Sequence, residues 1–325
     1  MTDRSIEESQ SNADARRAKG EFVRGQSGFR GWLGTDAFPA VAGRYHLFVA
    51  LNCPWCHRVT LARNVLGLQN AISLDVAFPN REDNLWTFDP TKIATLTGAT
   101  LEECTWETAS GEGHRYAKAL YEAEGSEEKS LPVLYDKKAK RIVTNESADI
   151  MRMLGAYAGA LGGNGIALYP DALAEEIDAL NTRIYTDINN GAYKAGFSSD
   201  QSVYAAAFEA YFEALAWLND LMSDGRAFLT GDGFTEADLR LFPTLYRHDP
   251  VYYVRMKLNG ARVLDYPYLW RWLCRVYALP GVPESNSLVY CRQGYFGNSW
   301  NKTVPLGPTS PRYPEAYLQP ELADK

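Results

Sequence analysis

The apolar pattern near the start of the ordered sequence predicts a β-α-β unit. Residues 45–51 (YHLFVAL) form a continuous apolar run, which is typical of a strand buried on both faces. Residues 54–66 carry apolar side chains at near-helical spacing, with Pro54 suited to the first helical turn and Gly67 suited to the end. A second apolar run, residues 72–78 (ISLDVAF), predicts a strand parallel to the first, because a helix connects the two.

A polar segment separates this unit from a second pair of strands. Residues 79–130 are polar and irregular, with one predicted helix near residues 116–123. Two β-type runs, residues 131–135 and 141–144, flank the turn DKKAK and predict a hairpin. A helix is expected to follow from Asn145. This order, β-α-β and then β-β-α, is that of a thioredoxin-type domain.

The later part of the chain has helical patterning. Apolar residues recur at intervals of three and four in two stripes: Leu173, Ile177, Leu180, Ile184 and Ile188, then Phe208, Phe212, Leu215, Leu218 and Met222. Residues 235–238 (TEAD) predict a capped helix N-terminus, and residues 267–277 predict a further helix that ends before Pro280. An all-α C-terminal domain is therefore expected.

Three units follow from these patterns. We expect an N-terminal extension over residues 1–40, a thioredoxin-like α/β domain over residues 41–157, and an all-α domain with an extended tail over residues 158–325. The extension is polar and Gly-rich, and it is expected either to be mobile or to wrap another part of the protein. A length of 325 residues fits two domains of about 150 residues each.

Composition and charge narrow the class of protein. The chain has 33 Lys and Arg against 40 Asp and Glu, a net charge of −7, which argues against nucleic acid as a partner. No apolar stretch reaches the roughly 18 residues of a membrane span. The N-terminal residues lack the apolar region of a secretory signal, and an odd count of five cysteines does not suit a disulfide scaffold. We therefore expect a cytoplasmic protein with reduced thiols and no membrane partner.

The segment Cys-Pro-Trp-Cys-His at residues 53–57 has four interpretations. The first is covalent haem attachment, which would require export of the protein. The second is a zinc site, which would require a second close Cys/His pair. The third is a pair of buried cysteines that pack as small hydrophobic residues and have no chemical role. The other cysteines are scattered along the chain at Cys104, Cys274 and Cys291. A redox site is favoured, because Cys53 lies where a strand ends and a helix begins, and helix N–H groups stabilise a thiolate there. Cys53 is therefore predicted to be the exposed nucleophile, and Cys56 a buried thiol that at most resolves it.

Two further motifs predict a peptide-like ligand beside this thiolate. In thioredoxin-type domains a proline precedes the third strand, and the residue before it offers its backbone to an extended peptide. Leu131 and Pro132 stand at this place, and we expect the bond between them to be cis. At the next helix N-terminus, Ser147 can bind a carboxylate and Glu146 an ammonium, as a γ-glutamyl group requires. Glutathione binding is the resulting prediction, although Glu146 and Ser147 alone would suit a simple helix cap.

Longer segments resemble the glutathione transferase superfamily, and specifically the Xi-class glutathionyl-hydroquinone reductases. The resemblance runs from about residue 43 to residue 308. Its motifs are GRYHLFVALNCPWCHR (43–58), NLWTF, LPVLYDKK, IVTNES, TDINNGAYKAGF (186–197), DYPYLWRWL, LPGV (279–282) and VPLGP (304–308). The segments at 186–197 and 304–308 are similar to this class in particular.

The resemblance implies a reaction and a set of site residues. In this family a cysteine attacks the sulfur of a glutathionyl-hydroquinone, which gives free hydroquinone and an enzyme–glutathione mixed disulfide, and a second glutathione then releases oxidised glutathione. Carried over to this chain, Cys53 is the nucleophile and Tyr193 and Tyr295 are the tyrosines that assist proton transfer. The residues implied to hold glutathione are Trp86, Leu131, Glu146 and Ser147. A homodimer without a metal is also expected.

Several positions depart from the family pattern. Cys56 replaces an alanine, which makes an internal disulfide possible, and Gly294-Tyr295-Phe296 replaces His-Tyr-Tyr. Arg255 stands where the family has a histidine. Lys129 precedes the proline loop, and no counterpart of the family's arginine is assigned there. Two alternative functions follow: an omega-like thioltransferase or a glutathione-dependent lyase or dehalogenase on another aromatic substrate, and a non-catalytic interaction protein that keeps the glutathione transferase fold.

Overall fold

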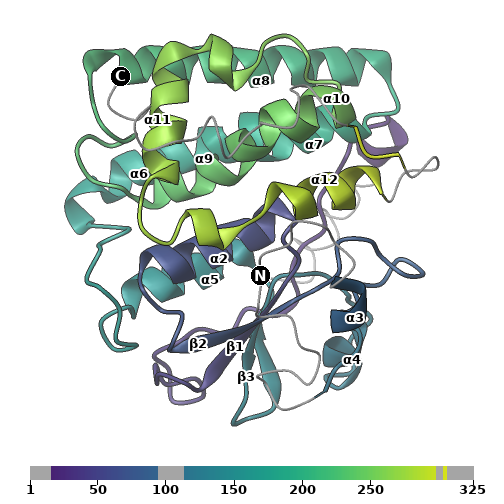
Figure 1. Ribbon diagram of the computed structural model, residues 1–325, viewed down its shortest axis with the longest axis vertical. Helices are drawn as coiled ribbons and strands as arrows, with labels where there is room; N and C mark the ends of the chain where they lie inside the picture. The colour runs from purple at the N-terminus through teal and green to yellow at the C-terminus, as the bar shows by residue number, and fades with distance from the viewer. Residues whose placement is uncertain (1–15, 94–112, 298–302, 306–325) are drawn as a thin grey trace.

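The computed structural model describes residues 16–93, 113–297 and 303–305, and Figure 1 shows a sheet-containing half beneath a larger helical half. The elements of the first half are β1 (Tyr45–Val49), α2 (Pro54–Val65), β2 (Ile72–Val76), α3 (Pro90–Ile93), α4 (Ala117–Glu122), β3 (Val133–Asp136), β4 (Arg141–Thr144) and α5 (Ser147–Ala156). The strands lie in the order β2-β1-β3-β4, with β1 parallel to β2 and antiparallel to β3. Strands β3 and β4 form the antiparallel hairpin. The predicted β-α-β and β-β-α units are confirmed.

Helix α2 lies between the sheet and the helical half, where it packs against α5 and α9 (Figure 1). Every residue of α2 is buried, although its mixed polar and apolar sequence does not predict a fully buried helix. The buried polar groups have partners: the Arg63 side chain donates to the carbonyl oxygen of Ile72 at 2.7 Å, and Thr60 donates to that of Ser285 at 2.9 Å. The residue that precedes α2 therefore lies at the junction of the two halves.

The helical half confirms the all-α prediction. Its longer helices are α6 (Ala174–Arg183), α7 (Asn190–Phe197), α8 (Gln201–Leu221), α9 (Glu236–Arg247), α11 (Pro267–Tyr277) and α12 (Leu288–Phe296). Two π-helical turns, η2 (Ile184–Asn189) and η4 (His248–Tyr252), and the short helix α10 (Tyr253–Arg255) extend these helices. The 3₁₀ turns are Asp171–Leu173, Met222–Asp224, Val263–Asp265 and Pro283–Ser285. The helix predicted over residues 267–277 has those bounds. In the first apolar stripe, Leu173 precedes α6, and Ile184 and Ile188 lie in η2.

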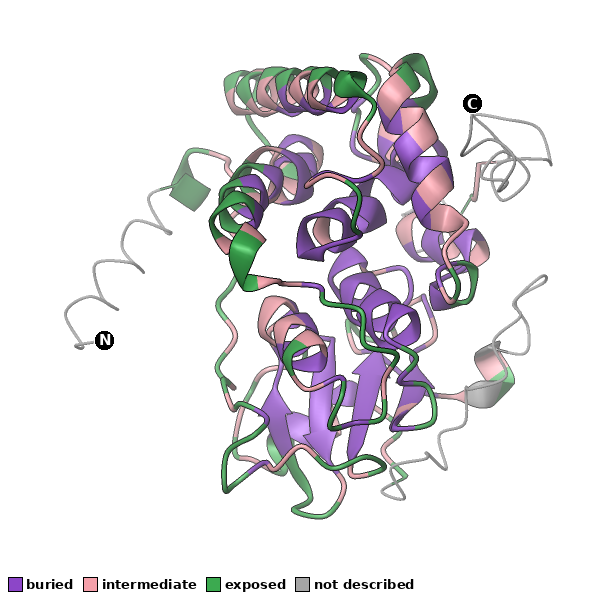
Figure 2. Ribbon diagram, turned by 90° about the vertical axis from the view of Figure 1, so that its left-hand side faces the viewer, coloured by how far each residue is buried: buried purple, intermediate pink, exposed green. Residues whose placement is uncertain are grey.

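The N-terminus of α9 confirms the capping prediction. The Thr235 side chain and the backbone of Asp238 form one arm of a capping box, and the Asp238 carboxylate accepts the Thr235 backbone N–H at 2.9 Å. The same carboxylate accepts the indole N–H of Trp272 at 2.8 Å, so α11 is fixed against α9 by a buried acid. In Figure 2 the strands are almost wholly buried, whereas α8, the uppermost helix, has an exposed outer face. In the described part of the chain, no helix is long and apolar enough to span a membrane.

The described part of the N-terminal extension wraps the protein. The Gly31 backbone N–H donates to the Val143 carbonyl oxygen at 2.8 Å, and Leu33 is fully buried. At the other end of this segment, the Gly20 carbonyl oxygen accepts the Ser199 N–H at 3.1 Å. The extension therefore runs from the helical half to the edge of the sheet, and residues 16–40 follow the second of the two predicted alternatives.

Candidate active site

Cys53 is the N-cap residue of α2, directly after the chain leaves β1. It is partly exposed, as predicted. The pKa of its thiol is lowered to about 6, chiefly because the Cys56 thiol donates a hydrogen bond to the Cys53 sulfur. The backbone N–H groups of Cys56 and Trp55 and the positive charge of Arg247 act in the same direction, whereas burial opposes them. Cys53 is therefore largely a thiolate at neutral pH.

Cys56 has the opposite character. It is fully buried, and its pKa is raised well above that of a free thiol by burial and by the neighbouring Cys53 sulfur. The predicted contrast between an accessible acidic cysteine and a buried one is confirmed. In the part of the chain described, Cys53, Cys56, Cys274 and Cys291 are free of disulfides, and Cys104 lies outside it.

A buried guanidinium from the helical half supports this loop. Arg247, the last residue of α9, donates to the carbonyl oxygens of Leu51 at 2.7 Å and Asn52 at 3.4 Å, and to His57 Nδ1 at 2.8 Å. Arg247 is fully buried, and no described carboxylate pairs with it. Burial and the charge of Arg247 lower the pKa of His57, so this imidazole stays neutral and can accept at Nδ1. Arg247 was not predicted from the sequence, because Leu51, Asn52 and His57 lie 190 or more positions away from it in the chain.

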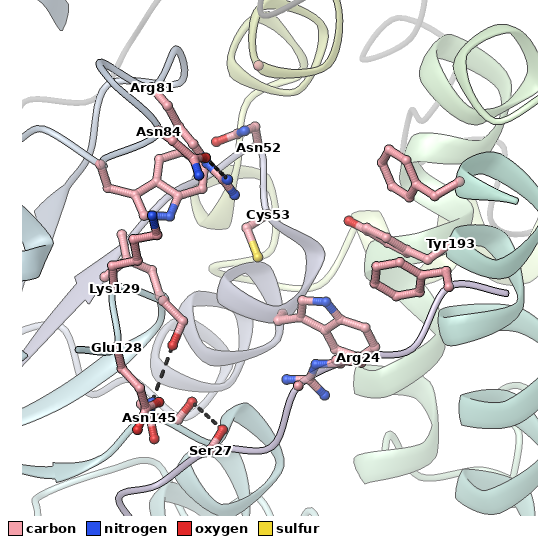
Figure 3. Close-up of a pocket in the computed structure, with 18 of the residues that line it drawn as sticks. Arg24, Ser27, Asn52, Cys53, Arg81, Asn84, Glu128, Lys129, Asn145 and Tyr193 are labelled. Carbon is pink, nitrogen blue, oxygen red and sulfur yellow. Dashed lines mark hydrogen bonds between the residues drawn. The ribbon is translucent and has the colours of Figure 1, made fainter. Parts of the chain in front are cut away.

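Cys53 opens into a cavity of about 940 Å³ between the two halves (Figure 3). In Figure 3 the Cys53 sulfur lies between Tyr193 of the helical half and a polar wall that contains Arg81, Asn84 and Lys129. The lining residues are Phe22, Arg24, Gly25, Gln26, Ser27, Asn52, Cys53, Trp55, Arg81, Asn84, Trp86, Glu128, Lys129, Ser130, Leu131, Asn145, Tyr193, Phe197, Arg255, Gly294 and Tyr295. Among these are five of the eight site residues predicted from the sequence: Cys53, Trp86, Leu131, Tyr193 and Tyr295.

The remaining three, Pro132, Glu146 and Ser147, are not among the lining residues but directly follow the lining residues Leu131 and Asn145 in the chain. The bond between Leu131 and Pro132 is cis, as predicted. Glu146 is the N-cap of α5 and accepts the Ala148 N–H at 3.0 Å, and the buried Ser147 hydroxyl donates to the Glu146 carboxylate at 3.3 Å. Glu146 is thus both a helix cap and a half-buried carboxylate. Burial favours its neutral form, but Arg24 and the Ala148 N–H outweigh this and lower its pKa.

The N-terminal extension covers this carboxylate. Arg24 Nη2 lies 3.6 Å from Glu146 Oε2, and the Ser27 hydroxyl donates to the same oxygen at 3.3 Å. The Arg24 guanidinium also lies 4.1 Å from the centre of the Trp55 ring. Neither Arg24 nor Ser27 was predicted, because a polar extension has no periodicity that would reveal its contacts.

Three tyrosine hydroxyls form a chain on the helical side of the cavity. Tyr193 Oη lies 2.6 Å from Tyr295 Oη, which lies 3.1 Å from Tyr252 Oη. Burial raises the pKa of each phenol, to about 12 for Tyr252, so all three keep their protons at neutral pH. One divergent position contacts this chain of hydroxyls: the Arg255 Nε–H donates to the Tyr295 carbonyl oxygen at 3.1 Å, so Arg255 anchors the end of α12 that carries Tyr295.

The described residues contain no cluster of three or more His, Cys, Asp or Glu side chains that could hold a metal ion. What the cavity offers is a thiolate, a row of neutral phenols opposite it, and cationic and polar groups around the sheet-side rim. This set suits sulfur transfer to or from an aromatic compound that carries an anionic peptide.

Comparison with known proteins places the chain in a family. Residues 52–156 match the family described as Glutathione S-transferase, N-terminal domain, and residues 201–275 match Glutathione S-transferase, C-terminal domain. The chain is 39% identical over 303 residues to the glutathionyl-hydroquinone reductase YqjG of Escherichia coli K-12, with 90% of this chain and 88% of that protein covered. It is 37% identical over 306 residues to the glutathionyl-hydroquinone reductase PcpF of Sphingobium chlorophenolicum, with 92% and 93% covered.

Solved structures agree with these relatives. The glutathione-bound structure of YqjG superposes with a TM-score of 0.78 at 36% identity, covering 90% of this chain and 95% of that one. The glutathione S-transferase Xi of Phanerochaete chrysosporium gives a TM-score of 0.80 at 33% identity, with 90% and 94% covered. The chain belongs to the glutathionyl-hydroquinone reductases, the Xi class of the glutathione transferase superfamily. The resemblance inferred from the sequence motifs is confirmed, and residues 306–308 of the VPLGP motif lie outside the described residues.

Proposed function

We propose that this protein reduces glutathionyl-hydroquinones to hydroquinones through a Cys53–glutathione mixed disulfide, with glutathione as co-substrate. The observation that carries the proposal is the placement of Cys53, with a pKa of about 6, in the same cavity as the hydrogen-bonded hydroxyls of Tyr193 and Tyr295. The two closely similar proteins named above are glutathionyl-hydroquinone reductases.

The first half-reaction breaks the bond between sulfur and the aromatic ring. The Cys53 thiolate attacks the glutathionyl sulfur, and the electron pair of the carbon–sulfur bond goes to the ring. A carbanion of this kind is a poor leaving group unless the ring tautomerises to a ketone or its carbon is protonated. A phenolic O–H near the substrate oxygen assists that step, and the Tyr193–Tyr295 pair supplies one that stays protonated at neutral pH. The products are hydroquinone and the Cys53–glutathione disulfide.

The second half-reaction regenerates the thiolate. A second glutathione attacks the sulfur of the bound glutathione, Cys53 leaves as a thiolate, and oxidised glutathione is released. Because the pKa of Cys53 is low, its sulfur is a good leaving group as well as an available nucleophile.

We assign glutathione to the wall formed by the sheet-containing half. Trp86 and the Leu131–Pro132 segment hold its backbone, while Ser147 and Glu146 hold the carboxylate and ammonium of its γ-glutamyl end. Arg24 and Ser27 contact Glu146 in the structure, so an ammonium that pairs with Glu146 must share or replace those contacts. In this proposal, the thioredoxin-like domain (residues 41–157) binds glutathione and the all-α domain (residues 158–325) binds the aromatic substrate. Residues 1–40 form the N-terminal extension.

Two properties of the protein in the cell complete the proposal. We expect it to be cytoplasmic, where its cysteines stay reduced and glutathione is abundant. We also expect it to be a homodimer, which size-exclusion chromatography with light scattering tests directly.

The experiment that tests the activity is incubation with a glutathionyl-hydroquinone and excess glutathione. Hydroquinone and oxidised glutathione are expected in equal amounts, and the Cys53→Ser variant is expected to form neither. Absence of hydroquinone, together with turnover of a mixed disulfide such as hydroxyethyl disulfide, would favour the omega-like thioltransferase. Absence of both activities, with a Cys53 thiol that titrates like free cysteine, would favour the non-catalytic alternative.

A further inference from the structure

Cys56 is a chemically capable group that the proposed reaction leaves unused. It occupies the third position of α2, and Cys53 occupies the N-cap. In a helix N-terminus these are the two positions whose side chains meet, as in a capping box. Cys53 and Cys56 occupy these two positions, so the second thiol stands beside the nucleophile at the start of α2 before any substrate arrives. The lowered pKa of Cys53, to which a hydrogen bond from Cys56 contributes most, agrees with this placement.

We infer that Cys56 is a resolving thiol, and that the enzyme can release glutathione from Cys53 by forming an internal disulfide. This inference rests on the proposed function, since the glutathionyl-hydroquinone supplies the oxidising equivalents in the first half-reaction. The Cys56 sulfur attacks the Cys53 sulfur of the mixed disulfide, and the bond between Cys53 and glutathione breaks. Glutathione leaves as a thiolate and takes up the proton that Cys56 loses. Two further glutathiones then reduce the internal disulfide and leave as oxidised glutathione.

Electrostatics favour this attack after Cys53 has reacted. In the reduced enzyme the Cys53 sulfur raises the pKa of Cys56, both by its charge and by accepting the hydrogen bond. Once Cys53 carries glutathione its sulfur is neutral, so both of these effects vanish. The Ala50 backbone and the Arg247 charge, which lower the pKa of Cys56, remain. Burial still opposes ionisation, but Cys56 becomes a better nucleophile at the stage where one is required.

Burial also makes Cys56 selective. Its side chain is fully enclosed, so small thiols and disulfides in solution cannot reach it, whereas Cys53 is in contact. Attack on Cys53 is intramolecular, and a well-oriented intramolecular group competes strongly with a free thiol. Internal resolution is therefore expected to dominate when glutathione is scarce, and direct attack by a second glutathione when it is abundant. The other described cysteines, Cys274 and Cys291, are also buried, and they lie in α11 and α12, away from the first turn of α2 in the sequence.

A single-turnover experiment tests this inference. Reduced enzyme is freed of glutathione and mixed with one equivalent of a glutathionyl-hydroquinone. Released hydroquinone and glutathione are measured by chromatography, and the mass of the intact protein is measured by mass spectrometry. We expect the wild type to release hydroquinone and glutathione and to become lighter by two hydrogens, with a peptide that joins Cys53 to Cys56. The Cys56→Ser variant, left to complete the reaction, is expected to retain glutathione on Cys53. The matched control Cys274→Ser is expected to end as the wild type does.

The outcomes separate the two claims. Wild type that releases hydroquinone but retains glutathione, as Cys56→Ser does, would overturn the resolving role and leave the proposed function intact. Wild type that releases no hydroquinone would overturn the proposed function. In that case one equivalent of oxidised glutathione loads Cys53 directly, and formation of the internal disulfide in the wild type but not in Cys56→Ser still decides the role of Cys56.

Discussion

Tyr193 Oη and Tyr295 Oη lie 2.6 Å apart although the two residues are separated by 102 positions in the chain. Helices α7 and α12 thus bring two protonated phenols together opposite the Cys53 thiolate. We predict that Tyr193→Phe lowers kcat by roughly 100-fold, the lower range for loss of a positioned proton donor. The pH dependence of Cys53 alkylation should stay close to that of the wild type, because the thiolate is stabilised from its own helix.

Tyr211→Phe is the matched control for this substitution. Tyr211 is fully buried whereas Tyr193 is partly buried, and the Tyr211 hydroxyl is hydrogen-bonded to His248 Nδ1 at 2.8 Å, but Tyr211 does not line the cavity. If Tyr211→Phe lowers kcat as strongly as Tyr193→Phe, the effect reflects packing of the helical half and not proton donation.

The acidity of Cys53 is expected to govern reactivity over the mildly acidic range. Its alkylation rate by iodoacetamide should rise with pH through a midpoint of about 6, because only the thiolate reacts. In Cys56→Ala the midpoint should move upward, since the largest cause of the low pKa is the hydrogen bond from Cys56. A midpoint unchanged in Cys56→Ala would show that the helix N–H groups and the charge of Arg247 account for the acidity without the Cys56 thiol.

The sequence predicted those features whose signals are local. Strand runs, helix caps and the Cys53 motif each occupy a few consecutive residues, and the structure places them as expected. Residues whose function depends on distant contacts had no such signal. Arg247, Arg24 and Tyr252 belong to this group, because each acts on atoms brought to it only by the packing of the two halves.

The helical half gives a second example of this limit. The spacing of Ile184 and Ile188 continues the apolar stripe of α6, yet both residues lie in the π-helical turn η2. An apolar stripe indicates which side chains are buried, but it does not determine the backbone hydrogen-bond pattern. Helix α12 was not predicted at all. Its residues are buried on several sides, so they show no amphipathic stripe.

Arg247 is expected to stabilise both the fold and the thiolate. Arg247→Met would leave His57 Nδ1 without its donor, at a cost of about 1–3 kcal/mol for this buried atom, whereas the Leu51 carbonyl oxygen would keep the amide of Asn286 at 2.8 Å. It should also raise the pKa of Cys53, because a nearby positive charge is lost. Arg247→Lys keeps the charge but not the planar fork, so stability should fall while the pKa rises less.

Chemical denaturation and the pH profile of Cys53 alkylation measure the two effects separately. Arg275→Met is the control, because the Arg275 guanidinium also donates to a backbone carbonyl, that of Ala227 at 3.0 Å, but outside the cavity. An Arg247→Met variant with an unshifted Cys53 profile would limit this residue to a structural role.

The ion pair between Arg152 of α5 and Glu236 of α9 is expected to hold the two halves together. Arg152 donates to both oxygens of the buried Glu236, at 2.6 and 2.8 Å. Arg152→Ala leaves Glu236 with Arg240 and Asn181, so we expect a loss of about 2 kcal/mol in the free energy of unfolding.

Urea denaturation checks this value. Arg226→Ala, which removes the exposed pair with Asp224, should cost less than about 1 kcal/mol and serves as the comparison. Equal losses in the two variants would mean that burial of Glu236 adds nothing to its interaction with Arg152.

The position of Arg247 limits how members of this family can be recombined. Its side chain arises from the helical half, but it donates to two carbonyl oxygens of the loop that carries the nucleophile and to His57 of α2. In a chimeric enzyme that takes its helical half from a relative, the residue at the position of Arg247 would come from the relative, whereas Cys53 would come from this protein. Substrate preference therefore cannot be exchanged as a module without also resetting the reactivity of the thiol.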